Sequence, residues 1–121
     1  MIIFISHPYA NAPVANTRRV RQIAKHLAQQ GHVPVATHLM FHGIVSESQR
    51  ETIMNVGFGL ITISDLVLTP NPEFVTYGCV TYGCLREYDY AYILCKKIQY
   101  YDPKNWRKIK IKGGCKCNTT Q

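Results

Sequence analysis

The stretch Ser64-Asp65-Leu66-Val67-Leu68 places an acid directly before a short apolar run, a pattern typical of a buried parallel strand. Further along, Gly83-Cys84-Leu85-Arg86-Glu87-Tyr88-Asp89-Tyr90-Ala91 predicts the start of a helix with a carboxylate in its first turn. The chain opens with Ile2-Ile3-Phe4-Ile5-Ser6-His7-Pro8-Tyr9, in which a strand leads into a polar loop and a helix. Because open α/β sheets bind ligands at one end of their strands, we expect Asp65 and Glu87 to meet there.

Strands and helices alternate along the whole chain, which predicts an α/β fold. We expect a Rossmann-like three-layer arrangement, with a mostly parallel sheet of about four or five strands, helices on both faces and a basic C-terminal edge strand. Ser46, followed three residues later by Gln49, resembles a capping box that opens the second helix. The expected strands are about 2–6, 33–36, 66–68 and 97–100, and the expected helices are about 14–30, from 46 onward, and 84–95.

Length and composition indicate one packed globular domain over residues 1–121, with 104–121 as a basic C-terminal extension. No apolar run approaches the roughly 18 residues of a membrane span. Residues 1–5 are apolar but lack a basic leader and a cleavage pattern, so they are interpreted as the first strand. We therefore expect a reducing, cytoplasmic location, where the 5 cysteines are free thiols.

The formal net charge of +7 is concentrated on the first helix and in the last eighteen residues. Both clusters suit anions. In Lys108-Ile109-Lys110-Ile111-Lys112 the charge alternates with period two, as in an edge strand whose lysines face outward and discourage further pairing. That interpretation is favoured over nucleic-acid binding, which remains open as a weaker alternative because no recognition motif accompanies the charge.

The region from Ile2 to about Tyr100 resembles the nucleoside 2-deoxyribosyltransferase-like superfamily, most closely its small bacterial and phage relatives. The pieces that carry the resemblance, in matching order and spacing, are residues 5–9, 16–24, 33–39, 64–68 and 83–91. The resemblance implies a Rossmann-like fold, a homo-oligomer of at least two chains, and the cytoplasm of a bacterium or phage-infected host. It also implies a glutamate nucleophile, which falls on Glu87, and an acid at the start of the preceding strand, which falls on Asp65.

The chemistry of an N-glycosidic bond fits these two acids. Its cleavage passes through an oxocarbenium-like state, which a carboxylate beneath the anomeric carbon stabilises or attacks. A first-turn position would let the helix dipole keep Glu87 ionised at neutral pH. Asp65 would hold the sugar hydroxyls or share a proton with the departing base. The structural alternative is that Glu87 is an ordinary capping residue of its helix.

A second set of residues is predicted to bind the ligand. The backbone at the head of the first helix favours an anion that Arg19 would pair with, and Tyr9 is suited to stack on a base or sugar. His7 and His38 are candidates for phosphate, although such histidines are more often structural, and Asn16 is more often a helix cap. The full candidate set is Ser6, His7, Pro8, Tyr9, Asn16, Arg19, His38 and Gly83.

Cofactor and metal chemistry find little support in the sequence. The first loop lacks the glycine-rich fingerprint of dinucleotide-binding folds, so we expect no nicotinamide cofactor. His38 and His42 are four residues apart without an evident third ligand, so no metal site is predicted.

The sequence thus predicts cleavage or transfer of a nucleotide or nucleoside N-glycosidic bond, with Glu87 as nucleophile. Arg18, Arg19 and Arg86 favour a nucleotide over a nucleoside because they would neutralise phosphates. The alternative is a protein without turnover that binds and sequesters a nucleotide-derived signal.

Overall fold

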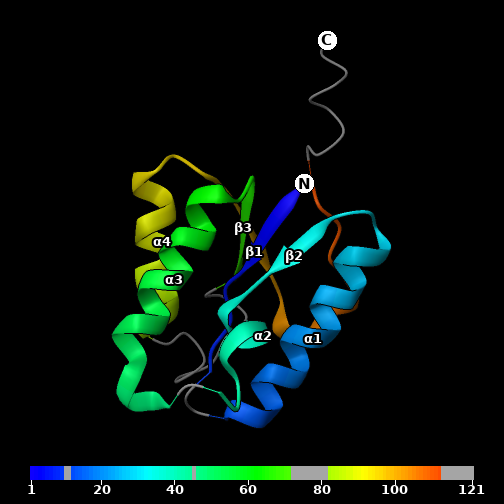
Figure 1. Cartoon of the computed structure of the whole chain (residues 1–121). Coiled ribbons are helices and arrows are strands. Elements are labelled where there is room, and N and C mark those ends of the chain that lie inside the picture. The colour runs from blue at the N-terminus through cyan, green and yellow to red at the C-terminus, as the bar shows by residue number, and fades with distance from the viewer. Residues whose placement is uncertain (10–11, 45, 72–81, 113–121) are drawn as a thin grey trace.

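The structure, a computed structural model, describes residues 1–9, 12–44, 46–71 and 82–112. Its centre is a four-stranded sheet in which every neighbouring pair is parallel, with the strand order β2-β1-β3-β4 (Figure 1). The strands are β1 (Ile2–Ile5), β2 (Val33–Val35), β3 (Leu66–Pro70) and β4 (Lys97–Tyr101).

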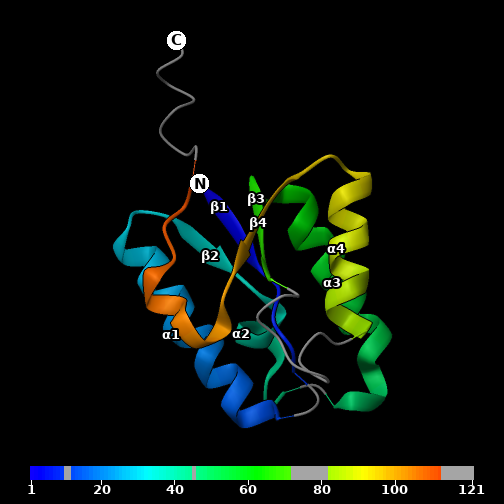
Figure 2. The same cartoon turned by 180° about the vertical axis from the view of Figure 1, so that it is seen from behind.

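Helices cover both faces of this sheet, which confirms the predicted α/β, Rossmann-like fold. The pair α3 and α4 lies on one face, whereas α1 and the 3-10 helix η3 lie on the other (Figures 1 and 2). The helices are α1 (Pro13–Gln29), α2 (Thr37–Phe41), α3 (Arg50–Ile63) and α4 (Tyr82–Ile93), and the 3-10 helices are η1 (Glu47–Gln49) and η3 (Pro103–Lys108).

The period-two geometry of β1 divides the core into two clusters. Ile3 and Ile5 face α1, where they pack in one cluster with Leu27 and other fully buried residues of that helix. Phe4 points to the opposite face and packs with Ile61 of α3. One strand therefore supplies both layers of the core, and its end at Ser6 is fixed from both sides.

The first helix follows the sequence prediction closely. It starts at Pro13, whose fixed φ and missing N–H suit a first helical position, and its buried residues include Val20, Ile23 and Leu27. After the helix, Gly31 adopts φ +90°, a left-handed conformation that glycine tolerates without strain. The predicted helix over about residues 14–30 is confirmed, and its buried residues lie on one face.

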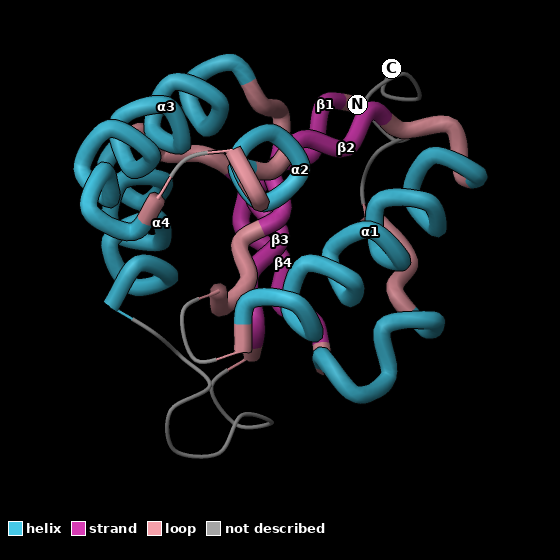
Figure 3. Tube along the Cα trace, turned by 60° about the horizontal axis from the view of Figure 1, so that its bottom comes forward, coloured by secondary structure: helices cyan, strands magenta, loops and turns pink. Residues whose placement is uncertain are grey.

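The stretch between β2 and α3 differs from the prediction. A short helix, α2, occupies residues that the sequence analysis did not assign to any helix, and it lies between α1 and α3 (Figure 3). The predicted capping box at Ser46 and Gln49 is wrong, because the Ser46 hydroxyl bonds Ser48 Oγ at 2.7 Å. One turn of η1 precedes α3, so Gln49 itself occupies the cap position.

The predicted basic edge strand over residues 108–112 is also wrong. Lys108 ends η3, and the following residues join no strand; the Gln99 side chain accepts from Lys112 N and donates to Lys110 O instead. The alternation of burial is nevertheless as expected, since Ile109 is 6% exposed while Lys110 is exposed. The segment thus covers the α1 face as an irregular strap, held by side chains rather than by a strand ladder (Figure 2).

Two further predictions concern the rest of the chain. The sequence Val-Thr-Tyr-Gly-Cys occurs at residues 75–79 and again at 80–84, which predicts a duplication that lengthened a loop; of these residues only 82–84 are among those described. Among the helices that the structure describes, none is both long and apolar enough to cross a membrane.

Candidate functional site

The site centres on Glu87, which α4 places against the end of β1. Glu87 is 8% exposed, and Ser6 Oγ donates a hydrogen bond of 2.7 Å to Glu87 Oε1. On the other side, a Cβ added at Gly57 of α3 would lie 3.5 Å from Glu87 Oε2 and 3.4 Å from Thr37 Cγ2. The carboxyl group therefore lies where β1, α2, α3 and α4 meet, at the carboxyl end of the sheet.

Burial controls the charge of this carboxyl group. Desolvation raises the pKa of Glu87 from 4.5 to about 7, and the hydrogen bond from Ser6 opposes that rise. The expectation that a helix dipole keeps Glu87 ionised is wrong, because α4 starts at Tyr82 and has no acid in its first turn. Near neutral pH both protonation states are present, which suits a group that exchanges charge during a reaction.

Asp65 lies at the opposite end of the sheet, where the strands begin. Its Oδ2 accepts from the backbone N–H of Ile2 at 2.7 Å, and its own N–H donates to Ile2 O at 2.8 Å. Ser6, which holds Glu87, comes four residues after Ile2, or about 13 Å along the strand. The prediction that Asp65 and Glu87 share one site is therefore wrong: an acid before a parallel strand lies at its amino end, whereas residues after the strand gather at its carboxyl end.

A buried histidine and a tyrosine support Ser6 from the α1 side. Tyr101, at the end of β4, donates to the Ser6 carbonyl at 3.0 Å and lies 2.5 Å from His7 Nδ1. Burial lowers the pKa of His7 to about 3, and the neighbouring His38 and Arg19 act in the same direction. His7 is thus a neutral hydrogen-bonding group at physiological pH. It would contact a phosphate through a hydrogen bond and not as a cation.

The remaining loop residues form an aromatic cluster beside this pair. His38 lies edge-on to the Tyr9 ring at 5.5 Å, and its Nε2 donates to the carbonyl of buried Pro8 at 3.0 Å. The Tyr9 hydroxyl lies 2.9 Å from His42 Nδ1. His38 Nδ1 is buried without a hydrogen-bond partner among the described residues, and burial lowers the pKa of its ring. A neutral His38 therefore holds the first loop through the Pro8 carbonyl.

Three other predicted ligand residues lie on helices: Asn16 and Arg19 on α1, and Gly83 on α4. Asn16 does not cap α1, whose N-cap is Ala12; its amide donates to Tyr9 O at 3.3 Å and also bonds His7. The Arg19 guanidinium donates to the Pro103 carbonyl, so it fastens η3 to α1. Gly83 lies in the first turn of α4, one turn before Glu87.

Arg86 is not where a phosphate-neutralising role would need it. Its guanidinium forms a 2.8 Å ion pair with exposed Glu51 and lies over the Phe58 ring, with 5.5 Å to the ring centroid. These contacts join α4 to α3 next to the solvent. The prediction that Arg86 faces the ligand with Arg18 and Arg19 is wrong, and Arg18 is exposed on the outer side of α1.

Sequence reasoning missed three residues of this site: Thr37, Gly57 and Tyr101. Thr37 and Tyr101 stand at the carboxyl ends of β2 and β4, and their place in the strand order was the available signal. Gly57 lies within α3, and no sequence pattern indicates that its missing side chain makes room for Glu87. The described residues contain no group of 3 or more His, Cys, Asp or Glu side chains able to hold a metal ion.

One family model matches most of this chain. The family model described as "Domain of unknown function (DUF7768)" matches residues 1–101. The chain belongs to the DUF7768 family. The match spans β1 to β4 and therefore every residue named around Glu87. No curated protein matches this DUF7768 chain.

A solved structure extends the comparison at the level of fold. The DUF7768 chain is similar to a 2-deoxyribosyltransferase from the psychrotolerant bacterium Bacillus psychrosaccharolyticus, with a TM-score of 0.63. The two share 16% sequence identity, and the match covers 92% of this chain and 93% of that chain. The expected resemblance to the 2-deoxyribosyltransferase fold is therefore confirmed for the architecture of the DUF7768 domain.

Proposed function

We propose that this protein cleaves or transfers the N-glycosidic bond of a nucleoside or nucleotide, with Glu87 as the nucleophile. The observation that carries the proposal is the buried Glu87 carboxyl, held by Ser6 at the carboxyl end of a parallel sheet. The fold is shared with a 2-deoxyribosyltransferase, which supports this class of reaction. In open α/β sheets that end of the strands is where ligands bind.

In the proposed reaction the ionised Glu87 attacks the anomeric carbon. The bond between that carbon and the base nitrogen breaks, its electron pair leaves with the base, and the base takes up a proton. The glycosyl ester on Glu87 is then resolved by water, which gives the free sugar, or by a second base, which gives a new nucleoside. Ser6 holds Oε1, so Oε2, which lies toward Gly57 and Thr37, is the oxygen that would attack.

The neutral groups around Glu87 support a polar, uncharged part of the substrate at this point. Tyr101 fixes the Ser6 backbone and thereby the serine that orients the nucleophile. Asn16 positions His7 and the Tyr9 carbonyl, so the first loop presents one arrangement to the ligand.

A second candidate function, binding without turnover, is favoured by the position of Asp65. Among the described side chains Glu87 is the one buried carboxyl group, so the predicted second acid does not assist it. A Glu87 with a pKa near 7 also donates a hydrogen bond when protonated, which suits retention of a nucleotide-derived ligand.

The experiment is incubation with a panel of nucleosides and nucleotides, followed by chromatography for free base and mass spectrometry of the intact protein. We expect base release and a glycosyl adduct on the peptide that contains Glu87. Glu87→Gln should abolish both. The matched control Asp65→Asn should retain both, because Asp65 lies at the amino end of the strands and Glu87 at their carboxyl end. Release that survives Glu87→Gln contradicts the mechanism. Stoichiometric binding with intact ligand recovered after denaturation supports the second candidate.

The homo-oligomer, the cytoplasmic location and the bacterial or phage origin remain predictions from the resemblance. Light scattering on the purified protein tests the first of these directly. A mass equal to one chain at micromolar concentration would contradict the predicted homo-oligomer.

A further inference from the structure

Two basic segments that are far apart in the sequence lie side by side on one face of the protein. The helix α1 and residues 103–112, which comprise η3 and the strap that follows it, together contain no acidic residue. Figure 2 shows the strap passing along α1. Their exposed cations are Arg18, Arg21, Lys25, Lys104, Arg107, Lys108, Lys110 and Lys112.

Arg19, whose guanidinium donates to the Pro103 carbonyl, and several neutral contacts hold the two segments together, so the exposed cations of this face are not used for that purpose. His26 Nε2 lies 2.8 Å from the Ile109 carbonyl, and Gln30 Nε2 donates to the same carbonyl at 3.2 Å. The ring of His26 also meets the Trp106 ring edge-on at 6.0 Å. An ion pair between Arg86 and Glu51 lies on the other side of the sheet, away from this face.

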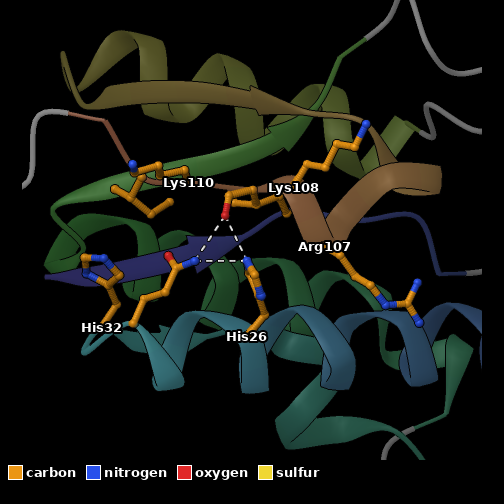
Figure 4. A pocket seen from close by; sticks show the side chains of 8 residues that line it. His26, His32, Arg107, Lys108 and Lys110 are labelled. Atoms are coloured by element: carbon orange, nitrogen blue, oxygen red, sulfur yellow. Dashed lines mark hydrogen bonds between the residues drawn. The ribbon is translucent and has the colours of Figure 1, made fainter.

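A pocket of about 560 Å³ lies in this face, between the end of α1 and the strap. Figure 4 shows His26 and His32 on one side of it and Lys108 and Lys110 on the other. Arg107 lines the same pocket. Its charged lining is entirely cationic, which creates a positive potential where the surface is hollowed.

The prediction that Lys108, Lys110 and Lys112 face outward from an edge strand does not explain these charges. Edge-strand lysines discourage pairing between sheets, but residues 109–112 belong to no strand. Trp106 does not offer a stacking surface either, because the Arg107 guanidinium lies 4.5 Å from its ring centroid. What the face offers to a partner is therefore a row of positive charges without a base-reading group.

We propose that this face, formed by α1 and residues 103–112, binds the phosphodiester backbone of a nucleic acid. From Arg18 to Lys25 the helix rises about 10 Å, the length of roughly three phosphates along one strand of a duplex. Contacts to phosphates position a protein without reading the bases, so binding is independent of sequence. His32 lines the pocket and contacts the N-terminal amino group, where β1 begins. The pocket therefore lies near the amino end of β1, whereas Glu87 lies at its carboxyl end. The proposal is thus independent of the reaction proposed for Glu87.

The test is fluorescence anisotropy with labelled 20-nucleotide strands of two unrelated sequences and with a duplex, from 50 to 250 mM salt. We expect similar affinities for both sequences and a linear fall of log K with log salt concentration. Arg21→Gln and Lys108→Gln should each weaken binding about tenfold at 50 mM salt and reduce the slope by about 0.7 to 0.9. Binding by either the single strands or the duplex supports the proposal and identifies the form preferred.

Two controls make the result decisive. Arg50→Gln removes the same charge from α3, on the other side of the sheet, and Glu87→Gln changes the candidate catalytic site; both should leave affinity and slope unchanged. The proposal is overturned by the absence of binding at 50 mM salt, or by an equal effect of Arg50→Gln. It is also overturned if a mononucleotide displaces the strand at the same phosphate concentration, because that indicates a compact phosphate pocket.

Discussion

Ser6 Oγ donates a hydrogen bond of 2.7 Å to Glu87 Oε1 and so joins the end of β1 to α4. The two residues are 81 positions apart in the sequence. Ser6 is 1% exposed and Glu87 is 8% exposed, so the bond forms away from water and holds the carboxyl group in one orientation. The stability of the fold and the charge of the site are therefore coupled through Glu87.

Ionisation of Glu87 should destabilise the protein as pH rises. The unfolded chain ionises this group near 4.5 and the folded protein near 7, so its contribution is fully present below pH 4.5 and lost as the pH passes 7. The loss amounts to about 3 kcal/mol. In urea unfolding at pH 5 and pH 8, Glu87→Gln should remove this part of the pH dependence. An unchanged difference between the two pH values would contradict the burial of the charge.

The proposed reaction should follow the same ionisation. Base release should rise with pH to a plateau, with a midpoint near 7, because the nucleophile is the ionised form of Glu87. Ser6→Ala removes the bond that favours the ionised form, so the midpoint should move to higher pH and the rate at pH 6 should fall about tenfold. A pH–rate profile of both proteins measures this. A midpoint that does not move would exclude Ser6 as the group that tunes the carboxyl.

The hydroxyl of Tyr101 should contribute measurably to stability. Tyr101→Phe leaves the buried Ser6 carbonyl without its donor and His7 Nδ1 without its partner, at a cost of about 1–3 kcal/mol. The matched control is Tyr100→Phe, since Tyr100 is 45% exposed and its hydroxyl makes one long contact of 3.5 Å. Urea unfolding should show no resolvable change for the control. Equal effects of the two substitutions would argue against the buried network.

The missing side chain of Gly57 should matter more for the site than for the helix. Gly57→Ala places its Cβ at ordinary contact distances from Thr37 and Glu87, so stability should stay constant or rise by up to about 1 kcal/mol. Gly57→Leu should destabilise the protein by about 1–3 kcal/mol and displace Glu87. Gly59, which has nothing within 4 Å, is the control: Gly59→Leu should be well tolerated. Thermal unfolding of the three variants tests this difference.

The strap should depend on its inward side chains although it is not a strand. Ile109→Ala should cost about 2–4 kcal/mol because Ile109 packs in the core cluster of α1. Lys110→Ala, at the neighbouring exposed position, should change the free energy of unfolding by less than about 0.5 kcal/mol. Comparable losses for both would show that the alternation of burial is not maintained in solution.

Most of the fold was predictable because its signals are local. The apolar face of α1, the runs at residues 2–5 and 66–68, and Gly31 each indicate an element through short-range geometry. The strap was assigned wrongly because period two reports which side chains face inward and not whether the backbone finds a strand partner. The helix α2 is only five residues long, so it has too few turns to show a helical period.

The site was predictable in part. Glu87 and Ser6 follow from the loop and helix after the strands, and the structure does bring them together. The prediction for Asp65 was wrong because residues before a parallel strand and residues after it lie at opposite ends of the sheet. Burial was the other missing quantity: the pKa of Glu87 depends on what α2 and α3 place around it, and no local pattern carries that information.

The strap also has a consequence for how the protein is made and for how fragments of it behave. The family match ends at residue 101, yet Ile109 and Trp106 pack against the core cluster that α1 forms. A nascent chain therefore cannot complete that side of its core until residue 111 has left the ribosome, although α1 is among the first elements synthesised. A fragment cut at the family boundary would leave this cluster uncovered and prone to associate with other chains.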